Sequence, residues 1–363
     1  MTPEEFLDIA RGCKRFFRGH YPLSASDRMN EIAAHPACQG YPQDVYGQRG
    51  FLAEFEREVA ELFGLEAGVF MPSGTMAQQI ALRIWADRSE NPVIAFHPKC
   101  HLECHEQMAY EQIHHLRAVL LGEPERLFTI DDLKKIEEPI GTLLIELPQR
   151  DLGGQLPTWE DLCEIVSYAK SKGMRVHLDG ARLWQCEPFY GRSLREICEL
   201  FDSVYVSFYK DLNGLPGALL LGPADFVAES RIWLRRHGGN LFTQFPAVIS
   251  AKIGMEKYLP KMPLYVAKAK EVSKVLALIE GVQVIPPLPH TNMMHLAFDI
   301  EPERLLDAVG QVAKAEGVLL FNYAGPCGDG CRTEVSLGDA SLDLSDQEIG
   351  ELFSRLMVIA RDS

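Results

Sequence analysis

Several short segments of the sequence carry side chains of the kinds that bind and activate small organic molecules. They supply paired hydroxyls, an imidazole, a carboxylate, an amine and a guanidinium, at Ser73–Thr75, His101, Asp179, Lys210 and Arg332. An amine can attack a carbonyl group, and a guanidinium can grip a carboxylate with two hydrogen bonds. Each segment is therefore a candidate part of a small-molecule site.

The segment "MPSGT" follows an apolar run and begins a helical pattern, which places Ser73, Gly74 and Thr75 at a predicted helix start. Free backbone N–H groups and the helix dipole favour an anion at such a start, and the two hydroxyls add hydrogen bonds. The lysine and glycine spacing of a Walker loop is missing. An ordinary helix N-cap is the alternative interpretation.

Asp179 ends the predicted strand of "VHLDGARLW". A carboxylate at the end of a buried strand costs several kcal/mol unless it meets a cation or a strong donor. An ion pair with Arg182, three residues later, is one interpretation. The other is that Asp179 binds a positively charged ring nitrogen.

Lys210 follows the apolar run "SVYVSF". A partly desolvated amine beside other cationic groups has a lowered pKa and becomes a nucleophile for a carbonyl. A solvated lysine in a turn is the alternative.

The segment "FHPKCHLECHEQMAY" places His101 four residues before His105, and Cys100 four residues before Cys104. On a helix either pair shares a face, as zinc ligands can. A structural zinc site usually needs a second pair of ligands, and "CGDGC" at 327–331 is only a weak candidate. We therefore predict no metal, and expect one imidazole to lie against a flat cofactor; a pair of surface histidines is the third interpretation.

The order of these groups along the chain is typical of a pyridoxal phosphate enzyme. An anion nest and a histidine come first, Lys210 follows Asp179 by 31 residues, and Arg332 lies near the C-terminus. The aldehyde of that cofactor needs a lysine, its pyridine nitrogen needs an acid and its phosphate needs a nest. The sequence therefore predicts pyridoxal 5'-phosphate as cofactor and an amino acid as substrate.

The resemblance to a known family is specific. "DVYGQRGFLAEFEREVAELFGLEAGVFMPSGTMAQQIAL", "HLDGARLW" and Lys210 resemble the threonine aldolase and β-eliminating lyase family of fold-type I, aspartate aminotransferase-like enzymes. The similarity covers most of residues 40–222 and is thinner beyond them. It implies a homodimer, or a homotetramer built from dimers, with active sites at the subunit interface.

The resemblance also implies a role for each matching residue. Lys210 is the Schiff-base lysine, Asp179 pairs with the pyridine nitrogen, and His101 stacks on the pyridine ring and helps remove the substrate hydroxyl proton. The residues implied to hold the cofactor are Ser73, Gly74, Thr75, His101, Asp179, Arg182, Ser207 and Lys210. The residues implied to hold the substrate are Tyr46, Glu106, Arg182 and Arg332.

The sequence departs from the family pattern at identifiable places. Tyr209 and Asp211 flank the lysine where the family usually has serine and glycine, and "FRGHYPLS" replaces an "RSDT"-like segment. "HGGNLFTQFP" lacks the Met-Arg-Gln run whose arginine reaches the phosphate of the neighbouring subunit. The candidate substitutes are Arg235, Arg236 and the hydroxyl of Thr243.

The elements that must position these residues alternate between helical and strand-like patterns. Near-continuous apolar runs are typical of strands buried on both faces of a mostly parallel sheet. The predicted strands are 67–71, 93–97, 117–121, 142–148, 175–179, 203–208 and 218–222. In the helix over 51–64, Phe51, Phe55, Val59 and Leu62 are predicted to share the buried face.

These patterns predict a three-layer α/β/α fold with a small C-terminal α+β domain. We expect an N-terminal arm without clear periodicity over 1–45, a large cofactor-binding domain over 46–250 and the small domain over 251–363.

Composition limits the class of protein. The 363 residues include 36 Lys and Arg against 51 Asp and Glu, a net charge of -15, which disfavours nucleic acid and anionic membranes as partners. Apolar runs are too short to cross a bilayer, and the acidic start is unlike a signal peptide. Nine cysteines without regular spacing favour reduced thiols. We therefore expect a cytoplasmic enzyme.

The predicted reaction is retro-aldol cleavage of a β-hydroxy-α-amino acid to glycine and an aldehyde, with threonine or allo-threonine as the default substrate from the resemblance alone. The nearest alternatives keep the cofactor and change the bond cleaved, giving β-elimination, racemisation or transamination. A more distant alternative is a non-catalytic protein that binds metal through the histidine and cysteine cluster.

Overall fold

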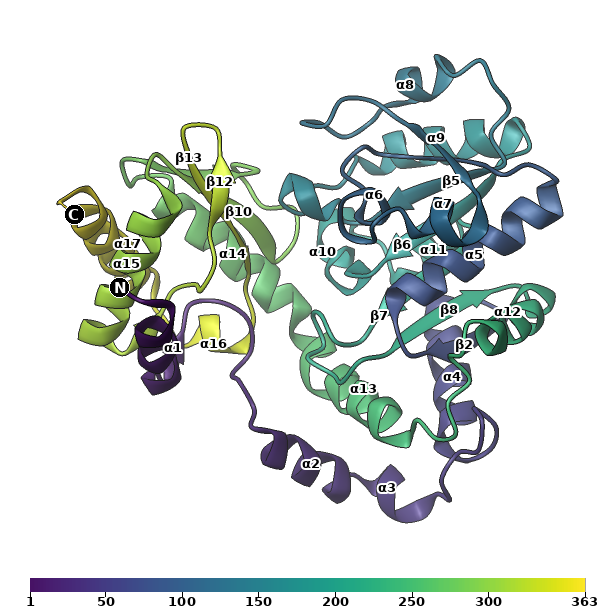
Figure 1. Ribbon diagram of the computed structural model, residues 1–363, viewed down its shortest axis with the longest axis horizontal. Coiled ribbons are helices and arrows are strands. Elements are labelled where there is room, and N and C mark those ends of the chain that lie inside the picture. Colours follow the sequence, from purple (N-terminus) through teal and green to yellow (C-terminus); the bar gives the residue numbers. More distant parts are fainter. Residues whose placement is uncertain (363) are drawn as a thin grey trace. The chain divides into compact units, whose positions relative to one another are not determined.

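The computed structural model describes residues 1–362, which form two compact units (Figure 1). The large unit comprises Ser24–Asp151 and Leu156–Pro260, and the small unit comprises Met1–Leu23, Leu152–Gln155 and Lys261–Ser363. These limits differ from the predicted divisions at residues 45 and 250. The start of the chain packs on C-terminal helices, whereas α13 (Phe245–Tyr258) packs on α4 (Gly50–Phe63) of the large unit.

The large unit is built on a sheet of seven strands in the order β2-β8-β7-β6-β5-β3-β4. The strands are β2 (Ala67–Met71), β3 (Val93–Phe96), β4 (Arg117–Leu120), β5 (Thr142–Glu146), β6 (Arg175–Gly180), β7 (Ser203–Ser207) and β8 (Ala218–Gly222). All predicted strands are confirmed. Neighbouring strands are parallel from β4 to β7, whereas β8 runs antiparallel to both β7 and β2.

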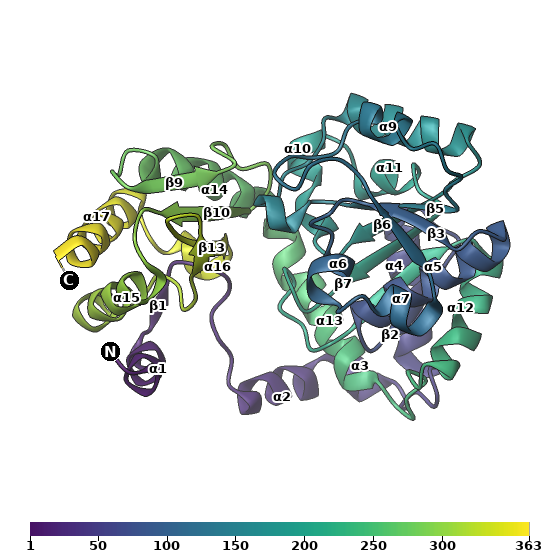
Figure 2. The same cartoon turned by 45° about the horizontal axis from the view of Figure 1, so that its top comes forward.

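Helices cover both faces of this sheet, as predicted (Figure 2). Val69 and Met71 of β2 pack with α5 (Gly74–Ser89) and α12 (Ala224–Arg236), whereas Phe70 between them contacts Phe55 of α4. Adjacent strand residues point to opposite faces, so these helices lie in different layers. The remaining helices of this unit are α2 (Ala25–Ala34), α3 (Pro36–Gly40), α6 (His101–His105), α7 (Ala109–His114), α8 (Ile130–Lys134), α9 (Trp159–Ser171), α10 (Glu187–Tyr190) and α11 (Leu194–Cys198).

The buried face of α4 differs from the predicted one. Phe55 and Val59 are fully buried as expected, but Leu62 is 38% exposed and Phe63 takes its place in the core. Gly64 ends the helix in the left-handed conformation, one residue after the last core side chain.

The small unit contains a four-stranded antiparallel sheet in the order β12-β13-β10-β9. Its strands are β9 (Val282–Ile285), β10 (Met293–Phe298), β12 (Gly325–Cys327) and β13 (Gly330–Ser336), and its longer helices are α1 (Pro3–Gly12), α14 (Met262–Leu276), α15 (Pro302–Glu316) and α17 (Asp346–Asp362). A short strand β1 (Arg15–Phe16) pairs with β11 (Val318–Leu319). This confirms the predicted α+β character.

The first 45 residues are more regular than predicted. They contain α1, β1, α2 and α3, and the fully buried Phe17 contacts Phe353 of α17 with ring centroids 4.9 Å apart. Capping residues explain two of these helices, because the hydroxyls of Thr2 and Ser24 accept backbone hydrogen bonds at their starts. Among the described residues, no helix is long and apolar enough to span a membrane.

Candidate active site

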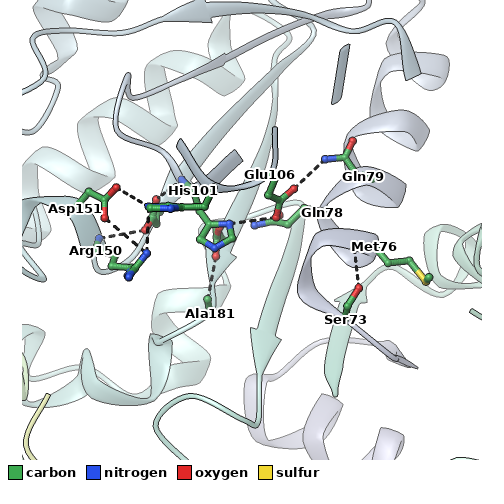
Figure 3. A network of polar contacts seen from close by, with 12 residues as sticks. Ser73, Met76, Gln78, Gln79, His101, Glu106, Arg150, Asp151 and Ala181 are labelled. Carbon is green, nitrogen blue, oxygen red and sulfur yellow. Dashed lines mark hydrogen bonds and ion pairs between the residues drawn. The ribbon is translucent and has the colours of Figure 1, made fainter. Parts of the chain in front are cut away.

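The predicted anion nest lies where β2 ends and α5 begins. The Ser73 hydroxyl accepts a hydrogen bond of 3.2 Å from the backbone N–H of Met76 and so caps the helix (Figure 3). The N-cap interpretation is therefore correct for Ser73. It is compatible with anion binding, because the hydroxyl hydrogen and other N–H groups of the first turn remain as donors.

Gly74 is required by the close approach of Tyr205. A Cβ atom at Gly74 would lie 1.9 Å from the Tyr205 hydroxyl oxygen and 2.5 Å from its Cζ atom. Tyr205 is only 2% exposed and projects from the centre of β7. The nest is thus a cradle that packs directly on an aromatic ring and admits no side chain.

Asp179 lies near the end of β6 and is 2% exposed. Its Oδ1 accepts a hydrogen bond of 3.1 Å from the backbone N–H of Ala181. Burial raises the pKa of Asp179, and the positive charge of Lys210 opposes that rise. A buried acid beside a lysine can hold a cationic group of a ligand.

Lys210 follows β7, the neighbour of β6 in the sheet. Burial, followed by the positive charge of Arg182, lowers the pKa of Lys210 to about 8, against the attraction of Asp179. A substantial fraction of the amine is therefore neutral near physiological pH, as a nucleophile must be. This environment contradicts the interpretation as a solvated turn lysine.

Arg182 and Ser207 also lie at this edge of the sheet. Arg182 precedes a 3-10 turn, Leu183–Gln185, directly after β6. Ser207 is fully buried, and its hydroxyl donates a hydrogen bond of 2.7 Å to the carbonyl of Ala181. Ser207 thus ties β7 to the loop after Asp179, and its role at the phosphate stays a prediction.

His101 begins α6 and is held by two carboxylates. Its Nδ1 lies 3.2 Å from Glu106 Oε1, and its backbone N–H donates to Glu146 Oε2 over 3.1 Å. Glu106 is 8% exposed, and its other oxygen accepts a hydrogen bond from Gln79 of α5. An ionised carboxylate only accepts, so Nδ1 carries the proton and Nε2 is left as a base.

Glu146 is a functional candidate that the sequence reasoning missed. It ends β5, pairs in register with Asp179 of β6, and accepts hydrogen bonds from the backbone N–H groups of His101 and Arg150. Burial, followed by repulsion from Asp179, raises the pKa of Glu146 to about 7. The sequence contains a pattern that could have identified it, because Glu146, like Asp179, is a carboxylate at the end of an apolar strand.

His105 lies one turn beyond His101 on α6, and the two ring centroids are 5.2 Å apart. Its Nε2 lies 2.8 Å from Asp151 Oδ2 and 3.1 Å from Arg150 Nη1. Within residues 1–362, no group of three or more His, Cys, Asp or Glu side chains is arranged to hold a metal ion.

Tyr209 and Asp211 have different environments beside Lys210. Tyr209 is 38% exposed, and the Lys210 Nζ lies 5.9 Å from the centroid of its ring. Asp211 is buried and accepts a hydrogen bond of 2.6 Å from Gln185. Asp211, which stands where the family usually has glycine, therefore binds Gln185 of the 3-10 turn after β6 and is part of the packing there.

Other predicted residues lie elsewhere, and their roles stay predictions. Arg332 belongs to the small unit, on β13. Tyr46 is 52% exposed and borders an open cavity of ≈ 700 Å³ in the large unit, which Arg235 and Arg236 also line. The hydroxyl of Thr243 donates to Asp44 over 2.9 Å.

Comparison with known proteins gives consistent matches. A family model described as beta-eliminating lyase matches residues 25–299. Low-specificity L-threonine aldolase 1 of Arabidopsis thaliana is 25% identical over 310 residues, which cover 82% of this chain and 84% of that protein.

Two crystal structures are similar over nearly the whole chain. One, from Listeria monocytogenes EGD-E, is provisionally assigned as an L-allo-threonine aldolase; it has a TM-score of 0.93 and 39% identity, and the match covers 98% of this chain and 99% of that one. The other, from Exiguobacterium sp. 255-15, is provisionally assigned as an aromatic amino acid beta-eliminating lyase/threonine aldolase. It has a TM-score of 0.93 and 37% identity over 98% of this chain and 99% of that one.

Proposed function

The chain belongs to the beta-eliminating lyase family, and from this premise we propose that it is a pyridoxal phosphate-dependent aldehyde lyase that cleaves β-hydroxy-α-amino acids to glycine and an aldehyde. Threonine and allo-threonine are the proposed substrates. The observation that carries the proposal is the electrostatic interaction of a buried acid, Asp179 of β6, with a half-buried amine, Lys210, which follows the adjacent parallel strand β7.

The residues at this edge fit the cofactor. At Gly74 the chain packs on Tyr205 and leaves no space for a Cβ atom, so it is the backbone N–H groups of this helix start that would contact a phosphate. Ser73, Gly74 and Thr75 would hold that phosphate, Lys210 the aldehyde carbon and Asp179 the pyridine nitrogen. Bound pyridoxal phosphate supplies a carbonyl for the amine and a ring that accepts the electron pair of the broken bond.

The chain itself supplies the groups that hold protons. Burial raises the pKa of Asp179, so its ionised form needs a cationic partner, and a cationic ring nitrogen would supply one. His101 presents Nε2 as the base for the β-hydroxyl proton of the substrate, because Glu106 fixes the proton on Nδ1. This base favours retro-aldol cleavage over racemisation and transamination, which remove no hydroxyl proton.

Two arginines are proposed to bind the substrate carboxylate. Arg182 follows Asp179 after β6, and Arg332, on β13, has this role only as the family resemblance implies it. A guanidinium holds a carboxylate through two parallel hydrogen bonds, which fixes the orientation of the amino acid as well as its position.

The proposal is tested with purified holoenzyme and a panel of β-hydroxy amino acids. We expect release of glycine and an aldehyde from threonine or allo-threonine, and a visible absorption band from lysine-bound cofactor. Lys210→Ala should abolish that band and reduce cleavage by at least about 1,000-fold, because the nucleophile is lost. Arg192→Ala, on the exposed surface, is the matched control. A normal band without glycine from any substrate would exclude the aldolase function while retaining the cofactor.

We also propose that the protein forms a homodimer through the surface around Tyr46. Tyr46, Ile232 and Phe242 are exposed by 52%, 55% and 60%, and Tyr46 packs edge-on against Phe242. Arg235 and Arg236 line the neighbouring cavity. Protein interfaces are enriched in aromatic residues and arginine, which are the residue types exposed here. The arginines would then face the cofactor phosphate of the partner, in place of the missing family arginine.

A further inference from the structure

Gln79 links the anion nest to the catalytic histidine. It lies on α5, the helix that begins at the nest, and is 1% exposed. Its Nε2 donates a hydrogen bond of 3.1 Å to Glu106 Oε2, whose other oxygen lies 3.2 Å from His101 Nδ1. Figure 3 shows the three side chains in a row from α5 to α6.

The orientation of the Gln79 amide is fixed by its partner. A carboxylate only accepts, so the amide must turn its NH₂ group toward Glu106. This leaves the amide oxygen, Oε1, buried without a hydrogen-bond partner among the described residues. Such an orphaned acceptor disfavours folding, and an apolar side chain of the same size would avoid it. Packing alone therefore does not explain a glutamine here.

We infer that Gln79 is a positioning residue, which keeps Glu106 ionised and oriented so that His101 carries its proton on Nδ1 and acts as a base through Nε2. The inference rests on the proposed function, in which His101 is that base. Gln79 acts only through Glu106 and contacts neither substrate nor cofactor. In hydrolases an acid orients the catalytic histidine. Here Glu106 has the position of that acid, and Gln79 in turn holds Glu106.

The direction of its effect follows from charge. Activity requires ionised Glu106 with neutral His101. A donor lost from Glu106 destabilises its ionised form, so the pair takes up a proton at higher pH. Among residues 1–362, the titratable groups that interact with His101 or Glu106 are Glu146, Asp179, Tyr205, Tyr209, Cys100 and His105. They are unchanged in the variants below.

The test is the pH profile of kcat/KM for Gln79→Met, which keeps the volume and removes the donor. We expect the acid limb to move upward by about 1 pH unit, the size expected for one hydrogen bond to a charged group. KM at high pH should be unchanged, since substrate contacts remain. Gln79→Glu should move the limb further, because it replaces a donor by a second carboxyl group.

Gln78→Met is the matched control. Gln78 is equally buried on the same helix, but its amide oxygen pairs with Nε2 of His177 over 2.7 Å. This variant should lower the thermal midpoint without moving the acid limb. If Gln79→Met behaved in the same way, the positioning role would be excluded and Gln79 would serve only stability.

Two further measurements separate this inference from the proposed function. Gln79→Met should cost nothing more in a Glu106→Gln background, because the relay is already broken; additive losses would contradict the relay. Nitrogen NMR of labelled His101 in apoprotein should show the Nδ1–H form in wild type and a mixture of tautomers in Gln79→Met. This readout needs no turnover, so it remains decisive if the protein cleaves no threonine.

Discussion

At the scale of single residues, the environment of Glu146 raises its pKa to about 7, which makes its protonation testable near neutral pH. It is 9% exposed, and its two oxygens accept hydrogen bonds from the backbone of His101, the backbone of Arg150 and the amide of Gln149. Asp179 lies beside it in register across two parallel strands. Two neighbouring carboxylates repel each other when both are ionised. Glu146 is therefore the one of the two that is protonated when Asp179 binds a cation.

Glu146→Gln should flatten the pH dependence of stability. The pKa of Glu146 is about 7 when folded, against about 4.3 in an unfolded chain. The folded state therefore holds the proton more tightly. This stability is fully present below about pH 4 and is lost as the pH rises to about 7. The loss is about 2–4 kcal/mol.

The thermal midpoint between pH 5 and 8 measures this effect. The variant should be less stable than wild type at pH 5, since its NH₂ group faces N–H donors, and the gap should narrow toward pH 8. Glu111→Gln, on the exposed part of α7, should follow wild type throughout. A gap that stays constant with pH would contradict a raised pKa.

Much of the site could be predicted from residue types, because the chemistry of each side chain is known and several of these side chains follow an apolar run of strand length. Asp179 is correctly predicted to lie near the end of a buried strand, whereas Lys210 lies in the loop that follows β7, beyond Ser207. Glu146 and Gln79 were missed for a common reason. Their importance depends on partners that the fold brings together, Asp179 through strand register and Glu106 through the packing of α6 on α5, and neither partnership leaves a local pattern.

At the scale of elements, the close fit between α5 and β7 shapes the proposed phosphate site at Gly74. Gly74→Ala would force the rigid ring of Tyr205 to move, since a Cβ atom would lie 1.9 Å from its hydroxyl oxygen. Overpacking of this kind costs about 1–3 kcal/mol. If the strain is relieved by withdrawing the helix start, affinity for pyridoxal phosphate should fall about 10- to 100-fold.

Equilibrium titration of apoprotein with pyridoxal phosphate, followed by absorbance, measures this loss. Unphosphorylated pyridoxal should bind Gly74→Ala and wild type almost equally, because only the phosphate meets the nest. Gly40→Ala, at a helical glycine with nothing within 4 Å of an added Cβ, is the matched control. Equal losses for both ligands would place the damage in the fold rather than in the nest.

Element types were more predictable than their partners. Apolar runs of strand length correctly predicted every strand of the large sheet, and the helical spacing of apolar residues correctly predicted α4. The antiparallel direction of β8 follows from the short link after Lys210, which returns the chain to the same sheet. Leu62 was misplaced because neighbouring positions at the last turn of a helix both satisfy the period, and only the packing of Phe63 on Trp184 decides between them.

At the scale of the whole molecule, the proposed dimer makes each site depend on two chains. Tyr46 itself has a backbone φ of 52°, a conformation that non-glycine residues adopt at a cost. The exposed side chain and the strained backbone fit a residue that is completed by a partner. Tyr46 is then expected to serve the site of the neighbouring subunit and not its own.

Subunit complementation tests this arrangement. Lys210→Ala and Tyr46→Ala homodimers should each be nearly inactive. In mixed dimers, isolated by two different affinity tags after co-expression, one site combines Lys210 from one chain with Tyr46 from the other, so about half of the wild-type activity should return. If both residues of a site came from one chain, each mixed dimer would have no intact site and would stay inactive. The separately purified homodimers, mixed without exchange, provide the baseline for this comparison.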